Sequence, residues 1–261
     1  MKIATWNING VKARIENLCQ WLQDSAPDIV CLQEIKTVDE GFPRLEIEAL
    51  GYHVETHGQK GFNGVAILSK SRPDEVTRGL PGDDTDEQSR FMEAVFSLPD
   101  NRALRVCCLY LPNGNPVETE KYAYKLAWME RLHAFAAERL RLEEPLILAG
   151  DYNVIPEPHD CFYPAVWASD ALFLPQTRQS FRRLENLGFT DAVRATTDAT
   201  KLYSFWDYQA GAWPKNNGIR IDHLMLSPEA ADRLSAAAIE KHVRAWEKPS
   251  DHVPVVAHFD F

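Results

Sequence analysis

The chain has 261 residues, of which 45% are apolar and 10% aromatic, while only 25% are charged. A chain of this size and composition can remove most of its surface from water, which excludes disorder of the whole chain, collagen, coiled coils and small disulfide-rich folds. Its 38 acidic residues outnumber the 28 basic ones, for a net charge of −10. This balance excludes a broadly basic coat for nucleic acid, although carboxylates that hold Mg²⁺ bring phosphates to an acidic protein.

Short apolar runs separated by turn residues recur along the chain and predict β-strands. In chain order they are residues 3–8, 28–33, 64–68, 91–98, 104–111, 146–149, 203–206, 219–226 and 253–259. Several runs are apolar on both faces, which indicates strands that are covered on both sides. We therefore predict one α/β (α+β) domain over residues 1–261, in which two packed sheets are flanked by helices.

Apolar residues spaced three or four positions apart predict helices between these strands. The clearest helix spans residues 118–142, and shorter ones are expected at 15–22, 45–50, 179–187 and 228–234. Before the last of these, Ser227 is a natural N-cap, and Pro228 suits the first turn. The polar stretches 81–87 and 157–174 are predicted to be loops.

The cysteines and the apolar runs also indicate a compartment. Five cysteines are an odd number without a C-x-x-C spacing, and most lie in apolar stretches, so we expect reduced, buried thiols. The amino terminus lacks the pattern of an export signal, and no run of about eighteen apolar residues predicts a membrane span. We therefore expect a cytoplasmic protein that does not interact with membranes, and the acidic composition is compatible with a monomer.

Polar side chains interrupt or end several of the predicted strands. They are Asn7, Glu34, Asp151, Asn153, Asp222, Asp251 and His252. Each has an ordinary structural explanation when taken singly, but strand ends bring side chains from distant segments together. Oxygen-rich ligands without a Cys/His cluster favour Mg²⁺, with Mn²⁺ as a possible substitute, over Zn²⁺. Asp222 is costly to bury among apolar neighbours without a partner, and His252 is the most plausible one.

Other catalytic motifs are missing from the sequence. It contains no G-x-S-x-G elbow, no G-x-x-x-x-G-K-[ST] loop and no G-x-G-x-x-G. Serine hydrolase, nucleotide kinase and dehydrogenase functions are therefore disfavoured.

Several short blocks run in order along the chain. They are WNING at 6–10, LQEIK at 32–36, GFNGVAI at 61–67, YLPNG at 110–114, GDYNV at 150–154, RID at 220–222 and SDHVP at 250–254. Together they resemble the signature of the exonuclease III family, which comprises Mg²⁺-dependent abasic-site endonucleases within the endonuclease/exonuclease/phosphatase superfamily. The resemblance implies a four-layered, DNase I-like α/β sandwich of two mixed sheets, with its site where the ends of the sheets meet.

The resemblance also implies a metal site built from strand-end residues. Glu34 is similar to the principal metal ligand, and Asn7 and Asp251 match residues close to the metal. Asp151 and Asn153 match the pair that orients and deprotonates the attacking water, and both are expected near the metal.

The remaining catalytic positions surround the phosphate in the same comparison. His252, held by Asp222, matches a His–Asp pair beside the scissile phosphate, and Tyr110 matches a group placed around it. Both Asp151 and His252 fit the role of the general base, and the sequence leaves that choice open.

Substrate binding is expected from two further groups of residues. Phe205 and Ile219, with Ile221, match the lining of a small pocket for a base-free sugar, and Ile219 stands where several relatives carry Trp. Flipping a sugar out of the duplex is cheapest where no base remains to unstack. The full set of predicted substrate-binding residues is Asn113, Lys36, Arg90, Phe205, Trp206, Trp213 and Ile219; scattered cations such as Lys125 are weaker candidates for contacts with the DNA backbone.

The resemblance implies a DNA repair nuclease that cuts double-stranded DNA 5′ to abasic sites and processes 3′ ends, leaving 3′-hydroxyl groups. One alternative is a dedicated 3′-end exonuclease with weak abasic-site incision. Others are a lipid phosphatase or secreted nuclease of the same superfamily, and a noncatalytic RNA-regulatory binding protein of the same fold. The YLPNG block favours the repair branch, and the retained metal and water ligands disfavour the binding protein.

Overall fold

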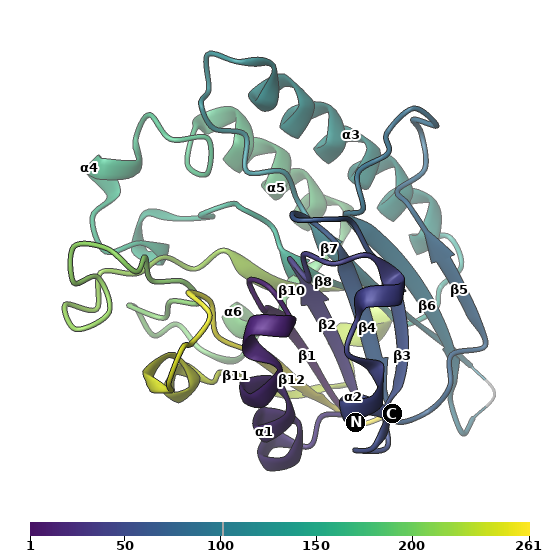
Figure 1. Cartoon of the computed structure of the whole chain (residues 1–261). Coiled ribbons are helices and arrows are strands. Elements are labelled where there is room, and N and C mark those ends of the chain that lie inside the picture. Colours follow the sequence, from purple (N-terminus) through teal and green to yellow (C-terminus); the bar gives the residue numbers. More distant parts are fainter. Residues whose placement is uncertain (101) are drawn as a thin grey trace.

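The computed structural model describes residues 1–100 and 102–261. Two six-stranded mixed sheets pack face to face, and helices cover their outer faces (Figure 1). The first sheet contains β1 (Lys2–Asn7), β2 (Ile29–Gln33), β3 (His53–His57), β4 (Val65–Ser69), β11 (Leu234–Ile239) and β12 (Val255–Phe259). The second contains β5 (Glu75–Arg78), β6 (Phe91–Ser97), β7 (Ala103–Tyr110), β8 (Leu146–Asp151), β9 (Thr190–Asp191) and β10 (Asp222–Leu226).

The apolar core is divided among the layers. Inward-facing side chains of both sheets, such as Ile3 and Ile147, form the central cluster. A second cluster joins the first sheet to α1 (Ile15–Ser25) and α2 (Arg44–Glu48), and a third joins the second sheet to α3 (Glu120–Leu140) and α5 (Pro175–Leu187). These layers confirm the predicted four-layered sandwich. That residues 1–261 form one domain is still a prediction.

Parallel strand pairs at the centre of each sheet position the polar residues. β1 runs parallel to β2, with Asn7 opposite Gln33, and β7 runs parallel to β8, with Tyr110 opposite Asp151. β10 is antiparallel to β8, so its first residue, Asp222, lies opposite the last residue of β8. Strand ends of both sheets therefore meet at one edge of the sandwich, as the resemblance implied.

The strand predictions fail at the edges of the sheets and at one inner segment. Residues 203–206 do not form a strand, because Phe205 makes only isolated bridges, to Ile219 and His252. The predicted strand at 219–226 begins at Asp222 instead. The apolar runs did not predict β3, β5, β9 and β11. Edge strands such as β5 and β11 expose one side to water, so they lack a continuous apolar run.

The long helix and three of the shorter helices are confirmed with shifted ends, but the last helix is shorter than predicted. α7 (Pro228–Ala231) stops before Leu234, which starts β11, and Ser227 caps it as predicted. The predicted loop 157–174 contains the 3₁₀ turn η3 (Pro158–Asp160) and α4 (Pro164–Trp167). The remaining short elements are α6 (Ala192–Thr196) and the 3₁₀ turns η1 (Lys12–Arg14), η2 (Asp39–Gly41) and η4 (Lys241–Ala245).

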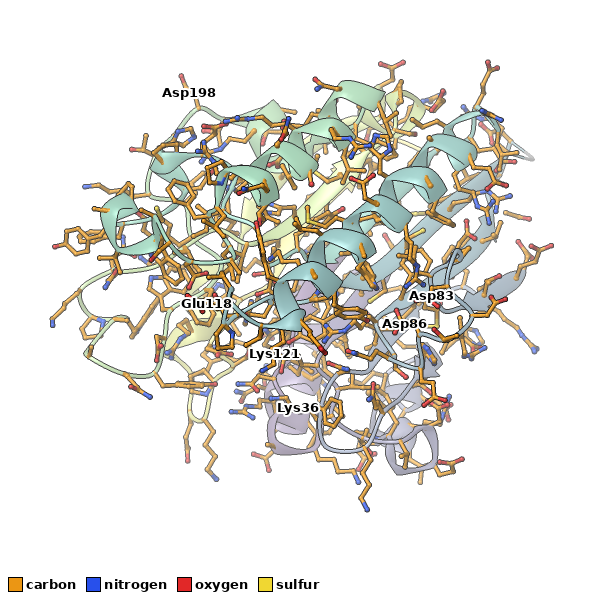
Figure 2. The ribbon with its side chains drawn as sticks, turned by 90° about the horizontal axis from the view of Figure 1, so that it is seen from above. Lys36, Asp83, Asp86, Glu118, Lys121 and Asp198 are labelled. Carbon is orange, nitrogen blue, oxygen red and sulfur yellow. The ribbon has the colours of Figure 1, made fainter. Side chains whose placement is uncertain are left out.

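The loop at residues 81–87 has no regular structure, as predicted. Asp86, labelled beside α3 in Figure 2, ties the loop to this helix. Its carboxylate accepts hydrogen bonds from the Tyr124 hydroxyl and the Arg131 guanidinium. The five cysteines carry free thiols, and all except Cys19 are buried, as expected. Among the described residues, no helix combines the length and apolar character that a membrane crossing requires.

Candidate active site

Three titratable side chains from distant segments converge where the sheet ends meet. Glu34 directly follows β2, Asp151 ends β8, and His252 precedes β12. One ligand atom from each of the three lies within 4.8 Å of the others. Asn7, at the end of β1, holds the two acids together, since its Nδ2 donates to Glu34 Oε1 and to Asp151 Oδ2 at 2.9 Å each.

The backbone around this cluster adopts an uncommon conformation. Glu34, Lys36, Asn9 and Asn153 all have φ between 47° and 54° without being glycine. Non-glycine residues in this left-handed region carry a local cost, and such residues concentrate at functional sites. The strand-end loops are therefore shaped for the positions of these side chains.

His252 is held firmly beside Asp151. Its Nδ1 lies 2.8 Å from Asp222 Oδ2, and its Nε2 lies 3.7 Å from Asp151 Oδ2. Trp6 Nε1 donates to the His252 carbonyl at 3.1 Å, and the Phe205 ring meets the imidazole edge to face at 5.0 Å. The structure therefore forms the predicted Asp222–His252 pair, and the fully buried carboxylate orients the imidazole.

Burial and charge shift the pKa values of these groups in a consistent way. Burial and the nearby Asp222 carboxylate raise the pKa of Asp151 to about 7. Burial alone would lower the pKa of His252, but the Asp222 and Asp151 carboxylates raise it to about 10. At neutral pH the imidazole is therefore a cation, and Asp151 stands close to its own midpoint.

Glu34 lies at the more open side of the cluster. Lys36 Nζ is 2.9 Å from Glu34 Oε2 and 2.5 Å from Asn9 Oδ1. Burial would raise the pKa of Glu34, but the Asn7 hydrogen bond and the Lys36 charge bring it below its usual value. Asn9 also donates through Nδ2 to Asp251 Oδ1 at 3.1 Å, which links Asp251 to the rim of the site.

Tyr110 lines the catalytic cavity, and Arg90 packs against it. The Arg90 guanidinium lies over the Tyr110 ring at 4.8 Å from its centroid, and its NH1 donates to the Tyr110 carbonyl. Burial and the Glu34 and Asp151 charges raise the pKa of Tyr110 well above its usual value. The phenol therefore remains a neutral hydrogen-bonding group.

Asn113 and Asn153 are connected to each other and to Lys125. Asn113 Nδ2 donates to Asn153 Oδ1, and the Asn153 backbone N–H donates to Asp151 Oδ1 at 2.9 Å. Lys125 Nζ donates to the carbonyls of Asn113 and Asn153. Burial lowers the pKa of Lys125 to about 7.

Lys125 was predicted only as a weak candidate for contact with the DNA backbone, and the structure contradicts that role because its side chain is fully buried. The buried positions on α3 are 125, 128, 129, 132, 135 and 136. Lys125 follows their spacing, so a cation on the apolar face of the helix was a readable signal for an internal role.

One side of the catalytic cavity is apolar. Phe205, Ile219 and Ile221 line it together with Trp167 and Leu172. Trp167 was not predicted, since it lies in a segment expected to be a loop.

Two other aromatic predictions need correction. Trp206 is fully buried and donates its Nε1 proton to Asn216, so it has no exposed surface for DNA. Trp213 packs edge to face against Trp206 at 5.0 Å and lines no part of the catalytic cavity. Both rings belong to a separate core cluster under the surface.

The cluster offers oxygen ligands for a divalent cation. Carboxylate oxygens of Glu34 and Asp151 face each other across the Asn7 amide, and oxygen ligands of this kind fit Mg²⁺. Asn7 turns its nitrogen to both carboxylates, so it positions them instead of presenting its own oxygen. Asn153 Oδ1 accepts from Asn113, outside the carboxylate group. The residues fit a cation held by the two acids.

Comparison with known proteins places this geometry among related folds. A model of the endonuclease/exonuclease/phosphatase family matches residues 4–252. Exodeoxyribonuclease III of Haemophilus influenzae is 36% identical over 274 residues, covering 99% of this chain and 100% of that protein. The structure of an AP endonuclease from Archaeoglobus fulgidus superimposes with a TM-score of 0.94 at 35% identity, and that of a 3′ phosphatase from Neisseria bound to a product DNA hairpin superimposes with 0.95 at 36%. Both cover 100% of each chain.

Proposed function

The chain belongs to the endonuclease/exonuclease/phosphatase family, and from this premise we propose a Mg²⁺-dependent DNA repair nuclease. It hydrolyses the phosphodiester 5′ to abasic sites in double-stranded DNA, acts as a monomer, and processes 3′ ends by 3′–5′ exonuclease and 3′-phosphatase action. The observation that carries this proposal is the convergence of Glu34, Asp151 and the Asp222–His252 pair in one cavity. Related exodeoxyribonuclease III and AP endonuclease sequences support the same reaction class.

Asp151 is proposed as the general base. Its carboxylate is held by the Asn153 backbone N–H at Oδ1 and by Asn7 Nδ2 at Oδ2, which positions it to accept the proton of the attacking water. The water oxygen forms a new bond to phosphorus, its proton passes to Asp151, and the bond between phosphorus and the 3′-oxygen breaks. The departing 3′-oxygen takes up a proton from solvent water. The products are a 3′-hydroxyl and a 5′-phosphate.

His252 is proposed as the cation beside the phosphate and not as the base. Asp222 keeps the imidazole protonated at neutral pH through the hydrogen bond to Nδ1. The Nε2 proton is then available to a nonbridging phosphate oxygen, where charge develops in the transition state. Tyr110 and Asn113 line the same cavity and add neutral donors.

Glu34 and Asp151 would hold Mg²⁺, and Mn²⁺ is the expected substitute. When bound, the metal supplies charge neutralisation at the phosphate and at the departing 3′-oxygen. Lys36 and Arg90 supply cationic groups for the DNA backbone on the two sides of the site. Phe205, Ile219 and Ile221 receive the sugar that follows the scissile phosphate.

An end-labelled duplex with one abasic-site analogue tests the proposal, with Mg²⁺ or with EDTA. We expect metal-dependent incision 5′ to the lesion, lost in Asp151→Asn. An undamaged duplex with a recessed 3′ end ranks the exonuclease activity in the same assay. Absence of cleavage of both duplexes at every Mg²⁺ or Mn²⁺ level would refute the proposal.

A dedicated 3′-end processor is the second candidate. The similarity to the Neisseria 3′ phosphatase, at 36% identity over both whole chains, favours it. Shortening of the recessed strand without incision at the abasic site would select this candidate.

A further inference from the structure

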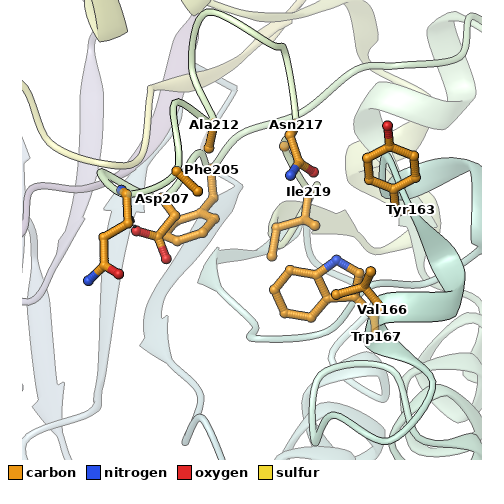
Figure 3. A pocket seen from close by; sticks show the side chains of 11 residues that line it. Tyr163, Val166, Trp167, Phe205, Asp207, Ala212, Asn217 and Ile219 are labelled. Atoms are coloured by element: carbon orange, nitrogen blue, oxygen red, sulfur yellow. Dashed lines mark hydrogen bonds between the residues drawn. The ribbon is translucent and has the colours of Figure 1, made fainter.

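A second hollow opens beside the catalytic cavity (Figure 3). Phe205, Ile219 and Trp167 line both spaces, whereas His252 lines only the catalytic cavity. Tyr163 and Val166, from the segment that carries α4, complete the apolar wall of this side hollow. The two spaces are therefore neighbours with a common aromatic and aliphatic partition.

The partition is fixed to the catalytic histidine. The backbone of Phe205 bridges to both Ile219 and His252, and its ring contacts the imidazole at 5.0 Å between centroids. By contrast, the α4 wall is open to solvent, with Tyr163 55% and Val166 72% exposed. Large apolar side chains with this exposure beside a catalytic cavity indicate a binding surface.

The polar residues of the side hollow select the chemistry of its occupant. Asp207, Gln209 and Asn217 line it, and no Lys or Arg occurs among its described lining residues. A carboxylate without a cation repels a phosphate. Flat apolar walls with donors and acceptors at the rim suit a nucleobase, whose faces stack and whose edge forms hydrogen bonds.

The adjoining cavity indicates which base this is. In the proposed reaction, the sugar after the scissile phosphate lies against Phe205 and Ile219. At an abasic site this sugar carries no base. At a 3′ terminus the same sugar carries a base, which is attached through the glycosidic bond. Because the side hollow shares Phe205 and Ile219 with the cavity that receives the sugar, it is adjacent to the place of this base. We propose that the side hollow binds the unpaired base of the 3′-terminal nucleotide that is being removed, an inference that rests on the proposed function.

Filling the hollow tests this assignment. Val166→Trp places a large ring on an exposed wall position, and Leu45→Trp, on α2, is a matched control at a residue 80% exposed. The substrates are one recessed duplex ending either in an unpaired 3′ nucleotide or in a 3′-phosphate, which carries no base. We expect Val166→Trp to lower kcat/KM for the nucleotide at least tenfold and to change phosphate removal less than twofold, and Leu45→Trp to change neither.

Two kinetic outcomes would overturn the proposal. An equal loss on both substrates would mean that the ring blocks the cleft in general. No loss on either would mean that the base lies elsewhere, for instance stacked within the duplex.

Binding without turnover gives a second readout in EDTA. The probes are the same duplex with an intact 3′-terminal nucleotide and with that nucleotide made abasic. Stacking of one base is worth about 1 to 3 kcal/mol, so we expect the intact duplex to bind about tenfold more tightly, and Val166→Trp to remove the difference. If the wild-type protein bound the two duplexes with equal dissociation constants, the proposal that the side hollow binds the terminal base would be refuted, even if the protein incises abasic sites. A tenfold ratio without any cleavage would refute the proposed function alone.

Asp207→Ala, which removes the side-chain acceptor, tests whether Asp207 recognises the edge of the base. A carboxylate accepts from the amino group of cytosine, which thymine lacks. We expect the wild-type protein to remove a terminal dC faster than a terminal dT and the variant to lose this preference. An unchanged preference would contradict base recognition by Asp207.

Discussion

Carboxylates of two buried clusters in this molecule have pKa values that are shifted in opposite directions. In the active site, Asp151 has its pKa raised to about 7. In the second cluster, Arg220 donates to Asp160 at 2.8 Å and to Asp191 at 2.6 Å. Burial alone would raise the pKa of Asp160, but Arg220 and Arg194 lower it to about 2.

The buried histidines repeat the contrast. Burial and the Arg220 charge lower the pKa of His223 to about 4, whereas carboxylates raise that of His252 to about 10. The Arg220 cluster carries its own cations, Arg220 and Arg194, so it serves the fold: it ties η3 to β9 and α6. In the active site three acids, Glu34, Asp151 and Asp222, face only two cations, Lys36 and His252. An excess of negative charge is the condition of a site that receives a metal and a proton.

The largest expected effect is on the cleavage rate when one buried aspartate of each cluster is replaced by asparagine. Asp151→Asn removes the proposed base and a metal ligand and should lower single-turnover cleavage by about 10⁴-fold, with DNA binding in EDTA retained. Asp160→Asn, the matched control, should leave the chemical step within a few-fold of wild type. If both variants lost cleavage activity to a similar extent, the Asp151 cluster would not be distinct in function from the Arg220 cluster.

Arg220→Met should damage stability more than chemistry. It leaves Asp191 buried without its arginine partner and Asp160 with Arg194 alone, and breaking a buried ion pair on one side costs about 3 to 5 kcal/mol of unfolding free energy. Urea denaturation followed by circular dichroism measures this loss. A change below about 1 kcal/mol would show that the Arg220 cluster is not an internally neutralised unit.

Asp222→Asn removes the charge that keeps His252 protonated. We expect turnover to fall by about 10²-fold with unchanged DNA affinity, because one positioned proton donor is lost. The remaining activity should decline at a lower alkaline pH than in the wild type, since the pKa of His252 falls. A pH profile of single-turnover rates checks this, and wild-type turnover in the variant would rule out the pairing as a catalytic device.

Acid should weaken the Arg220 cluster selectively. The pKa of Asp160 is lower in the folded state than in the unfolded chain, so its contribution is complete above about pH 4 and is lost as the pH falls toward 2. The shift corresponds to about 2 kcal/mol. The free energy of unfolding, measured by denaturation at several pH values between 5 and 2, should fall less steeply with decreasing pH in Asp160→Asn than in the wild type. The same pH dependence in both proteins would contradict the assignment.

The smallest expected effect is stabilisation by Mg²⁺. A ligand at ten times its dissociation constant adds about 1.4 kcal/mol to the folded state. Thermal unfolding with and without Mg²⁺ should show this increase in the wild type and in Asp160→Asn, but not in Glu34→Gln. If Mg²⁺ stabilised Glu34→Gln as much as the wild type, the metal would have to bind outside the catalytic cluster.

The sequence by itself determined the family, the sandwich and most members of the catalytic cluster. Apolar runs mark where strands end, and Asn7, Glu34 and Asp151 stand at those ends, so their convergence follows from local pattern and strand direction. The Asp222–His252 pair was also predictable, because a carboxylate in an apolar run requires a partner.

The tertiary structure alone decided which polar groups face one another. Residues 203–206 look like a strand because they are apolar, but only packing shows that Trp206 fills the core while Phe205 separates two cavities. Asp160 and Arg220 are 60 residues apart, and nothing local distinguishes their neutralised pair from the partly compensated acids of the active site. Local periodicity sets burial, whereas charge balance and cavity shape depend on which distant segments meet.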